Sequence, residues 1–295
     1  PQPRSRGLGD VYKRQARYKE ISQQLARARV SGDEAQALVD EGKAIVWIDF
    51  GLHSTEVAHG QTAPWMAYKA VTEETEEMQV IRDNVIFLLV PNMNPDGTTL
   101  VAEWYMQHVG TQYEGAPHPE LYQKYVGHDN NRDWYMFSQV ETQLSIQMQN
   151  EFPPLFTLHQ HQMGSNGSRI FVPPFEDPWE PGVDPALIAS NNLIGTFMGQ
   201  HLTAKGYVGV EWKERYDSWT PARAYAHYHG GSRILTEVAS SRYADDLEIP
   251  TELIGEDYQR ARWNFPMPWP GGTWTFKEVV DYHYCLLYTS DAADE

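Results

Sequence analysis

The stretch Trp47–Glu56, WIDFGLHSTE, decides how the rest of the chain is interpreted. It belongs to an apolar run that begins at Ala44, is rich in β-branched and aromatic residues, and is bounded by Gly51. Such a run is typical of a buried strand. The turn after this strand carries His53 and Glu56, whose three-residue spacing places an imidazole and a carboxylate on one side. Both side-chain types bind zinc, although a simple polar turn would use the same residues.

Four further motifs follow this turn along the chain. They are NPDG at 94–97, GHDNNRDW at 127–134, HQMG at 161–164 and LTEVAS at 235–240. Together with GLHSTE, they resemble the pattern of the carboxypeptidase A-like zinc metallopeptidases, and they occur in that family's order. The resemblance covers roughly residues 43–282. Five motifs in the right order are far more specific than any one of them.

The resemblance implies a single zinc ion bound by His53, Glu56 and a histidine that ends a different strand. Two histidines are candidates for the third ligand, His159 and His161. His161 fits the family's pattern better, because a short polar turn and then a strand ending in proline follow it. Relatives often carry Asp at the position of His159. We therefore expect His161 to be the ligand, and a hydrogen-bonded histidine at a strand end is the alternative for either residue.

The resemblance also implies roles for residues of the GHDNNRDW and LTEVAS motifs. Asp129 corresponds to the carboxylate that supports a zinc-bound histidine and fixes its tautomer. Asn131 and Arg132 correspond to the pair that binds the free C-terminal carboxylate of the substrate, a role that suits a planar guanidinium. The alternative for Arg132 is a surface ion pair with Asp133. Glu237 corresponds to the general base, which takes a proton from zinc-bound water and passes it to the leaving amine.

Two features depart from the family's pattern. The family carries an arginine soon after NPDG that helps to hold the oxyanion, but residues 97–123 contain no Lys or Arg. Arg169 and Arg223 are candidates that could reach the site from elsewhere in the chain. The substrate-capping tyrosine is not placed by any motif. Tyr216, Tyr225 and Tyr228 lie upstream of Glu237, in the right general region for it. Trp219, Tyr225 and Tyr228 are candidates for lining the substrate pocket, and a place in the core is the alternative for each.

The five motifs, through this resemblance, predict a zinc metallocarboxypeptidase. Such an enzyme hydrolyses the C-terminal peptide bond of a substrate with a free carboxylate. One alternative is a zinc amidohydrolase or deacylase acting on small N-acyl amino acids or cell-wall peptides, because such enzymes share the zinc motif and the later His and Glu. The Asn131–Arg132 pair does not separate the two, since both kinds of substrate carry a carboxylate. A metal-free, non-catalytic binding domain is disfavoured, because all the ligand types and the base are present.

Composition limits the partners of the chain. Its 295 residues include 40 acidic and 23 basic side chains, which gives a net charge of −17. This charge disfavours binding to nucleic acid or to anionic membranes, since both attract clustered Lys and Arg. No apolar run approaches the ~20 residues that are needed to span a bilayer. The one cysteine is Cys285, so the residues before it offer neither a disulfide nor a thiol nucleophile. The sequence leaves the oligomeric state open.

Both ends of the chain resemble translated sequencing adapters. The segments SRGLGDVYKRQ at 5–15 and CLLYTSDAADE at 285–295 can each be encoded by a transposase-type adapter read in frame. We therefore expect residues 1–15 and 285–295 to be foreign to the protein. Residues 16–284 are expected to form one zinc carboxypeptidase-like catalytic domain. An ordinary basic arm and acidic tail are the alternative.

Predicted strands and helices alternate along the chain. Strands are expected at 44–50, 84–90, 155–161, 169–172 and 234–238. Helices are expected at 56–82, 138–151, 185–205, 252–262 and 276–282, with a long surface loop over 98–131. The alternation predicts an α/β fold with its site at the carboxyl edge of the sheet. The resemblance implies a mixed, mostly parallel sheet flanked by helices, in the phosphorylase/hydrolase-like fold. Since residues 16–42 are helix-like, we expect the family's first strands to be missing.

Overall fold

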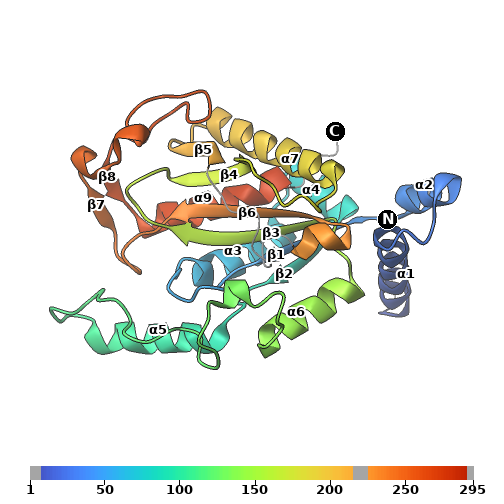
Figure 1. The fold of residues 1–295 in the computed structure, drawn as a ribbon, viewed down its shortest axis with the longest axis horizontal. Helices are drawn as coiled ribbons and strands as arrows, with labels where there is room; N and C mark the ends of the chain where they lie inside the picture. Colours follow the sequence, from blue (N-terminus) through green and yellow to red (C-terminus); the bar gives the residue numbers. More distant parts are fainter. Residues whose placement is uncertain (1–7, 215–224, 291–295) are drawn as a thin grey trace.

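The computed structural model of the chain describes residues 8–214 and 225–290. In this part of the chain, one six-stranded sheet has the order β2-β1-β3-β6-β4-β5 (Figure 1). Its strands are β1 (Ala44–Asp49), β2 (Val85–Val90), β3 (Phe156–Met163), β4 (Ile170–Phe175), β5 (Val210–Glu214) and β6 (Ser232–Ala239). The first four strands in this order are parallel, β4 runs antiparallel to β6, and β5 is parallel to β4. The predicted mixed, mostly parallel sheet is confirmed.

Helices surround the sheet. The α-helices are α1 (Leu8–Ala26), α2 (Gly32–Glu41), α3 (His59–Thr72), α4 (Glu76–Asn84), α5 (Pro95–His108), α6 (Val140–Glu151), α7 (Pro185–Ala204) and α9 (Phe276–Ser290). Short 3-10 turns are η1 (Asn130–Arg132), η2 (Tyr225–His229), η3 (Thr251–Leu253) and η4 (Glu256–Tyr258), and β7 (Leu247–Ile249) pairs with β8 (Gly272–Trp274). Among the helices of the described residues, none combines the length and hydrophobicity that crossing a bilayer requires.

The main hydrophobic core lies between one face of the sheet and helices α3, α7 and α9. Ile48, Leu158 and Val238 enter this core from three strands. Because side chains alternate along a strand, Trp47 points to the opposite face, where it joins a smaller apolar cluster that α6 contacts through Ile146. The sheet therefore has one apolar face for the core and a second face that is free to carry polar residues near the strand ends.

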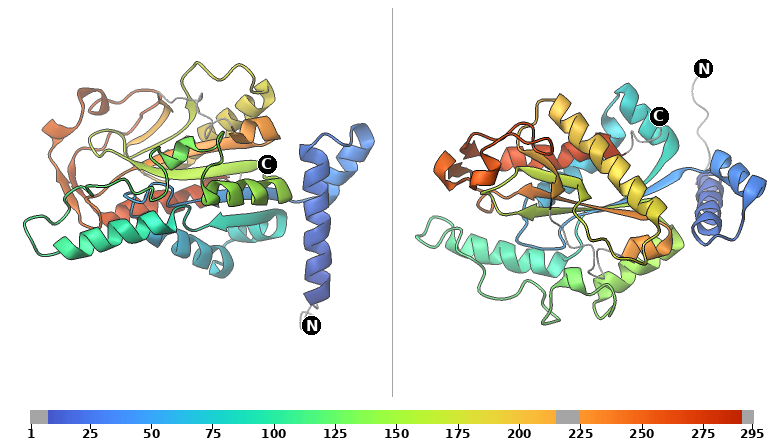
Figure 2. Two further views of the ribbon diagram at one scale, coloured as in Figure 1. Left: turned by 60° about the horizontal axis from the view of Figure 1, so that its bottom comes forward. Right: turned by 45° about the horizontal axis from the view of Figure 1, so that its top comes forward.

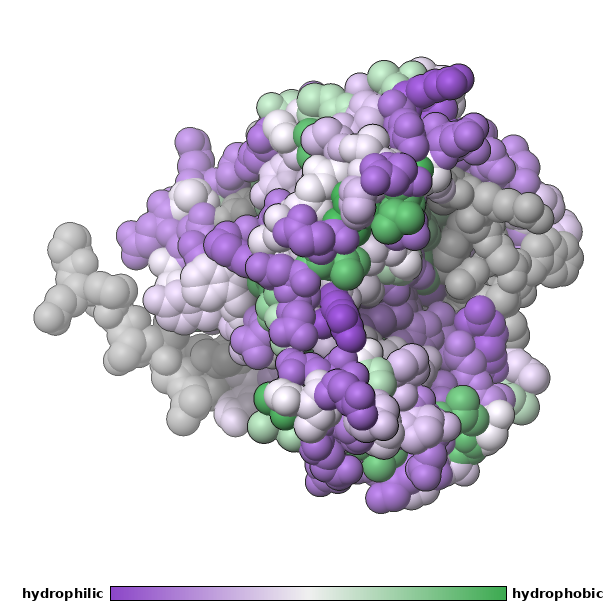
Figure 3. Space-filling model, turned by 90° about the vertical axis from the view of Figure 1, so that its left-hand side faces the viewer, coloured by the Kyte–Doolittle hydropathy of each residue, from purple (hydrophilic) through white to green (hydrophobic). Residues whose placement is uncertain are grey.

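The carboxyl ends of β1, β3 and β6 meet at one edge of the sheet, at the left in Figure 1. Residues that follow parallel strands are brought together at such an edge. The space-filling view of this side shows a hollow whose visible lining is hydrophilic (Figure 3). Helices α1 and α2 lie at the opposite, amino-terminal edge and stand out from the rest of the fold (Figure 2). The fold thus leaves the carboxyl edge available for a site.

Three segments differ from their predicted structure. The single helix expected at 56–82 is interrupted between α3 and α4, because Thr75 caps a new helix by accepting a hydrogen bond from the Met78 N–H. The loop expected at 98–131 begins inside α5, which Asn94 caps and Pro95 starts. The helix expected at 252–262 is two 3-10 turns, η3 and η4, separated by Gly255. The missing first strands and the foreign ends stay predictions.

Candidate metal centre

The turn after β1 presents His53 and Glu56 at the carboxyl edge. Gly51 lets the chain leave the strand, since its φ is +70° and a Cβ there would lie 2.7 Å from Asn92 Oδ1. The Glu56 N–H donates to the His53 carbonyl at 3.0 Å and closes the turn. Glu56 Oε1 lies 2.7 Å from His53 Nδ1. The turn therefore places the two predicted ligands side by side.

The NPDG motif supports this turn from the neighbouring segment. The Asn94 amide donates to the Leu52 carbonyl at 3.4 Å, and its oxygen accepts from the Gly97 N–H at 3.0 Å. Gly97 packs so tightly that a Cβ would lie 2.5 Å from Ser54 Oγ. The motif thus braces the residues beside His53.

His161, near the carboxyl end of β3, completes a group of three metal-ligand side chains. Its Nδ1 lies 3.2 Å from His53 Nδ1 and 3.3 Å from Glu56 Oε2. The ligand atoms of all three residues lie within 4.8 Å of one another. Glu56 is 9% exposed and His161 is 1% exposed. Within the described residues, this is the group of His, Cys, Asp or Glu side chains that is close enough to hold a metal ion.

The electrostatics of this group fit a metal cation. Glu56 Oε2 is buried, and its near neighbour among the ligand atoms is His161 Nδ1 at 3.3 Å. A buried carboxylate is unfavourable unless a donor or a cation compensates its charge. Burial would lower the pKa of His53, but the carboxylates of Glu56 and Asp129 raise it to about 10. The two carboxylates therefore favour a positive charge beside them, at the position of His53. Two imidazoles and one carboxylate form a ligand set that zinc accepts.

Asp129 lies behind His53, where the sequence predicts a supporting carboxylate. Its Oδ1 is 3.2 Å from His53 Nε2 and accepts from the Asn131 N–H at 2.8 Å. Burial would raise the pKa of Asp129, but its bond to His53 and the neighbouring positive charges lower it to about 2. Asp129 is therefore ionised at neutral pH. A carboxylate in this position fixes the orientation of a ligating imidazole.

His159, the alternative third ligand, is engaged elsewhere. Its Nδ1 lies 2.7 Å from Asp49 Oδ2, and Trp47 Nε1 donates to the same oxygen at 2.7 Å. His159 and Asp49 are paired in register on β3 and β1 and are both almost fully buried. His159 therefore lies outside the group of three ligands. Asp49 is not among the residues predicted for the site, although a lone carboxylate in an apolar strand is a usable signal.

Glu237 lies beside His161 in the sheet. The two residues are paired in register on the parallel strands β3 and β6, so their side chains leave the sheet on the same face. Phe171 of β4 is the register neighbour of Glu237 on its other side. Glu237 is also the one residue of β6 that is not fully buried. The predicted general base is thus next to His161, one of the three candidate metal ligands.

Asn131 and Arg132 are connected to the candidate metal centre by Asp129, which precedes them in the chain and contacts His53. Both belong to η1, where Asn131 is 3% exposed and Arg132 is partly exposed. Arg132 Nη1 donates to the Asn131 carbonyl at 3.2 Å, and its positive charge contributes to the lowered pKa of Asp129. The adjacent Asp133 is fully buried and lies 2.8 Å from His128 Nε2. Arg132 and Asp133 therefore do not form the surface ion pair that was the alternative for Arg132.

Arg169, a candidate for holding the oxyanion, is a structural residue. Its guanidinium lies over the rings of Trp269 and Trp274, 4.3 and 4.9 Å from their centroids. It also donates to two backbone carbonyls of the preceding turn, and it is fully buried. These contacts keep Arg169 away from a substrate. The other candidates Arg223, Tyr216 and Trp219 lie outside the described residues.

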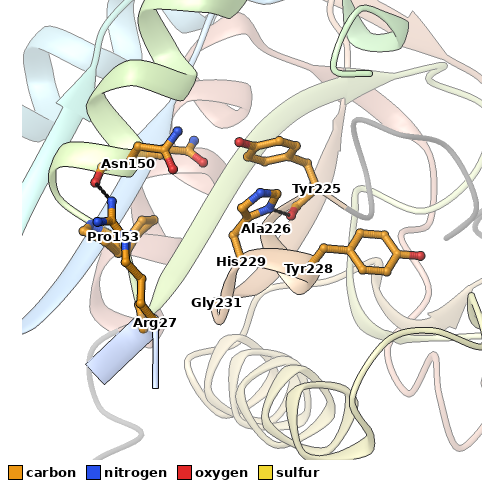
Figure 4. A pocket seen from close by; sticks show the side chains of 11 residues that line it. Arg27, Asn150, Pro153, Tyr225, Ala226, Tyr228, His229 and Gly231 are labelled. Atoms are coloured by element: carbon orange, nitrogen blue, oxygen red, sulfur yellow. Dashed lines mark hydrogen bonds between the residues drawn. The ribbon is translucent and has the colours of Figure 1, made fainter. Parts of the chain in front are cut away.

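Tyr225 and Tyr228 lie at the opposite edge of the sheet. Both line a separate pocket of about 200 Å³ (Figure 4). Gly231, which also lines this pocket, directly precedes β6, so the pocket lies at the amino-terminal edge. Tyr225 stacks on His229 with ring centroids 4.1 Å apart, and the Tyr228 hydroxyl donates to Glu180. The Tyr225 ring also lies 5.9 Å from the rings of Trp134 and Phe137, so it packs on the segment that follows Arg132.

Comparison with protein families gives one match. Residues 14–158 match the family model described as zinc carboxypeptidase. The matched stretch contains His53, Glu56 and Arg132, whereas His161 and Glu237 lie beyond it. A search of curated proteins found no match.

Comparison with solved structures identifies metallo-carboxypeptidases. That of Burkholderia cenocepacia has a TM-score of 0.56 and 13% identity, over 85% of this chain and 57% of its own. The metallo-carboxypeptidase of Pseudomonas aeruginosa in complex with (2-guanidinoethylmercapto)succinic acid has a TM-score of 0.56 and 17% identity, over 84% of this chain and 56% of its own. Carboxypeptidase A of Helicoverpa armigera has a TM-score of 0.50 and 16% identity, over 88% of this chain and 64% of its own. At these identities the likeness concerns the fold, and the chain spans less than two thirds of each structure's length.

The chain therefore has a carboxypeptidase-like fold and resembles the zinc carboxypeptidases, as its motifs predict. The group of His53, Glu56 and His161 can hold one metal ion, and the family model that matches residues 14–158 is that of a zinc enzyme. The roles of the individual residues stay predictions.

Proposed function

We propose that this chain is the catalytic part of a zinc-dependent metallocarboxypeptidase, which hydrolyses the C-terminal peptide bond of a substrate with a free carboxylate. The family match and the fold support a zinc metallopeptidase in general. The observation that carries the exopeptidase proposal is the connection between the candidate metal group and the loop of Arg132. Asp129 contacts His53 and lies three residues before Arg132.

His53, Glu56 and His161 are the proposed zinc ligands, and Asp129 is proposed to orient His53. A zinc ion held there would act as a Lewis acid that polarises the scissile carbonyl and makes water more acidic. The protein's own contribution is burial of two of the ligands, since Glu56 is 9% and His161 1% exposed. A low-dielectric setting strengthens each of these charge interactions.

Glu237 is the proposed general base. Its carboxylate would take a proton from the attacking water and pass it to the amine that leaves. A carboxylate suits both transfers because it can hold a proton on either oxygen. Its register position beside His161 supports this role.

Arg132 is the proposed anchor for the terminal carboxylate of the substrate, with Asn131 beside it. A guanidinium can donate two parallel hydrogen bonds to a carboxylate, which fixes the peptide's end relative to the metal. One of the similar structures, that from Pseudomonas aeruginosa, is a complex with a succinic acid derivative. A succinic acid carries carboxyl groups, so this complex supports a carboxylate-binding site in the fold.

A three-part substrate comparison tests the proposal on the zinc-loaded chain. N-acetylated tripeptides with a free carboxylate, the same peptides as C-terminal amides, and N-acyl amino acids would be incubated with the protein, and released amino acids would be measured by mass spectrometry. We expect release of the last residue from the free-acid peptides alone. Hydrolysis of the N-acyl amino acids alone would favour the deacylase alternative. A chain that binds no zinc and cleaves nothing would favour the non-catalytic binding domain.

A further inference from the structure

Asp133, the residue after Arg132, is a fully buried carboxylate that the mechanism above does not use. Its Oδ1 lies 2.8 Å from His128 Nε2 and accepts from the Ser138 N–H at 3.2 Å and from the Ser138 hydroxyl. Its Oδ2 accepts from the Gln139 N–H at 3.0 Å. Both oxygens therefore accept hydrogen bonds from its own loop, and Thr142 of α6 contributes a further bond to this carboxylate.

These donors come from the two ends of one loop, residues 128–139. His128 precedes Asp133 by five residues, and Ser138 and Gln139 follow it by five and six. A carboxylate that receives bonds from both ends holds the loop closed. Hydrogen bonds to a buried charge are among the stronger contributions that side chains make. Asp129 and Arg132 lie inside the loop and are fixed with it.

The backbone of Asp133 adds a second tie. Its carbonyl accepts from the Met136 N–H at 3.1 Å and from the Phe137 N–H at 2.7 Å. Phe137 has a φ of +52°, which a bulky residue rarely adopts. Strain of this kind persists where surrounding contacts over-determine the backbone, and it is commonly found at functional sites. The loop is thus held in one conformation at some energetic cost.

We propose that Asp133 is a positioning residue that holds Arg132 in the arrangement needed to bind a substrate carboxylate. The inference rests on the proposed function, because it assigns the carboxylate to Arg132. Asp133 itself touches neither substrate nor metal in this proposal. It acts by preorganising the loop, so its loss should weaken carboxylate binding and leave the zinc ligands intact.

Binding measurements separate this role from turnover. All variants would be made in a Glu237→Gln background, and the affinity for one N-acetylated tripeptide, as the free acid and as the amide, would be measured by calorimetry on zinc-loaded protein. Asp133→Asn replaces one carboxylate oxygen by an NH₂ group, so a donor would face a backbone N–H, that of Ser138 or that of Gln139. We expect the dissociation constant of the free acid to rise about tenfold or more, with one zinc per chain and an unchanged value for the amide.

Two variants remove single donors and leave Asp133 in place. Ser138→Ala and His128→Phe should each weaken binding of the free acid by about threefold or more, in the same direction. Ser190→Ala removes a hydroxyl from α7 that bonds only the Ala186 carbonyl, and Asp281→Asn removes an exposed carboxylate. Neither control should change either affinity.

The outcomes are distinct. A selective loss of free-acid affinity in Asp133→Asn, repeated more weakly in the two donor variants, supports the positioning role. Unchanged free-acid affinity in a folded Asp133→Asn protein overturns it. Should Asp133→Asn fail to fold, unchanged affinity in both donor variants overturns it equally. A parent protein that binds acid and amide alike contradicts the proposed function itself, and the inference falls with it.

Discussion

His161 and Glu237 are paired in register on the neighbouring parallel strands β3 and β6. Neighbouring strands lie about 4.8 Å apart, and paired residues project from the same face. The sheet therefore sets a candidate metal ligand and a candidate general base side by side without help from a flexible loop. Rigid elements of this kind hold reacting groups more accurately than loops do.

The third metal ligand can be tested by substitution. We expect His53→Ala and His161→Ala to abolish tight zinc binding, because each leaves two protein ligands for an ion that usually takes three. His159→Ala should keep the zinc, since His159 is bonded to Asp49. Zinc per chain after dialysis would be measured by mass spectrometry, with His229→Ala as a control. Loss of zinc in His159→Ala and its retention in His161→Ala would reverse the assignment.

Glu237→Gln should separate chemistry from binding. The amide keeps the size of the side chain but cannot accept the proton, so turnover should fall by about 10² to 10⁴ or more. Zinc content and peptide affinity should stay close to those of the parent. Single-turnover rates on a free-acid peptide provide the measurement. A variant with nearly normal kcat removes Glu237 from the mechanism.

Arg169 should matter for stability and not for catalysis. Its guanidinium is buried over Trp269 and Trp274, so Arg169→Met removes hydrogen bonds and cation–π contacts worth about 1–3 kcal/mol. We expect a lower Tm and an unchanged kcat/KM at temperatures where the variant is folded. Thermal melts and peptide assays on the same preparation test this. A large fall in kcat with an unchanged Tm would restore Arg169 as the oxyanion residue.

Asp133 should make the free energy of unfolding depend on pH in the acidic range. Burial would raise its pKa, but bonds from Ser138, Gln139 and His128 lower it below the ordinary value. Such a group stabilises the fold above its unfolded pKa of about 3.9, and this contribution is lost as pH falls through the lower folded pKa.

The free energy of unfolding would be compared for wild type and Asp133→Asn by urea denaturation. We expect the difference to be largest near about pH 6 and to shrink below about pH 4 as the carboxyl group is protonated. A difference that is constant with pH would show that the charge of Asp133 contributes nothing.

The strands and the zinc turn could be predicted because their signals are local. The apolar run that ends at Gly51 predicts β1, and the spacing of His53 and Glu56 predicts a pair on one side of the turn that follows. Parallel strands then bring residues after β1, β3 and β6 to one edge by geometry alone. For this reason the architecture was accessible from the order of the motifs.

Contacts between distant segments were not accessible in the same way. His159 and His161 lie on one face of β3, and the difference between them depends on Asp49, which meets His159 only through the pairing of β1 with β3. The start of α5 was missed, although Asn94 and Pro95 are ordinary helix-start residues. The strand β5 was also missed, because its sequence VEWKE has three charged residues and only two apolar ones.

The central claim is that Arg132 anchors a terminal carboxylate. A charge-assisted bidentate pair in a partly buried site can be worth a few kcal/mol, and about 1.4 kcal/mol is tenfold. Arg132→Ala should therefore lower kcat/KM on a free-acid peptide by about 10² or more. The amidated peptide should already be a poor substrate and should change little.

Four rates decide the matter: wild type and Arg132→Ala, each on one peptide as the free acid and as the amide. Arg132→Lys serves as the matched variant and should recover only part of the rate, because an ammonium cannot donate as a planar fork. We predict fast cleavage for wild type on the free acid alone. Equal cleavage of acid and amide by wild type would contradict the exopeptidase account.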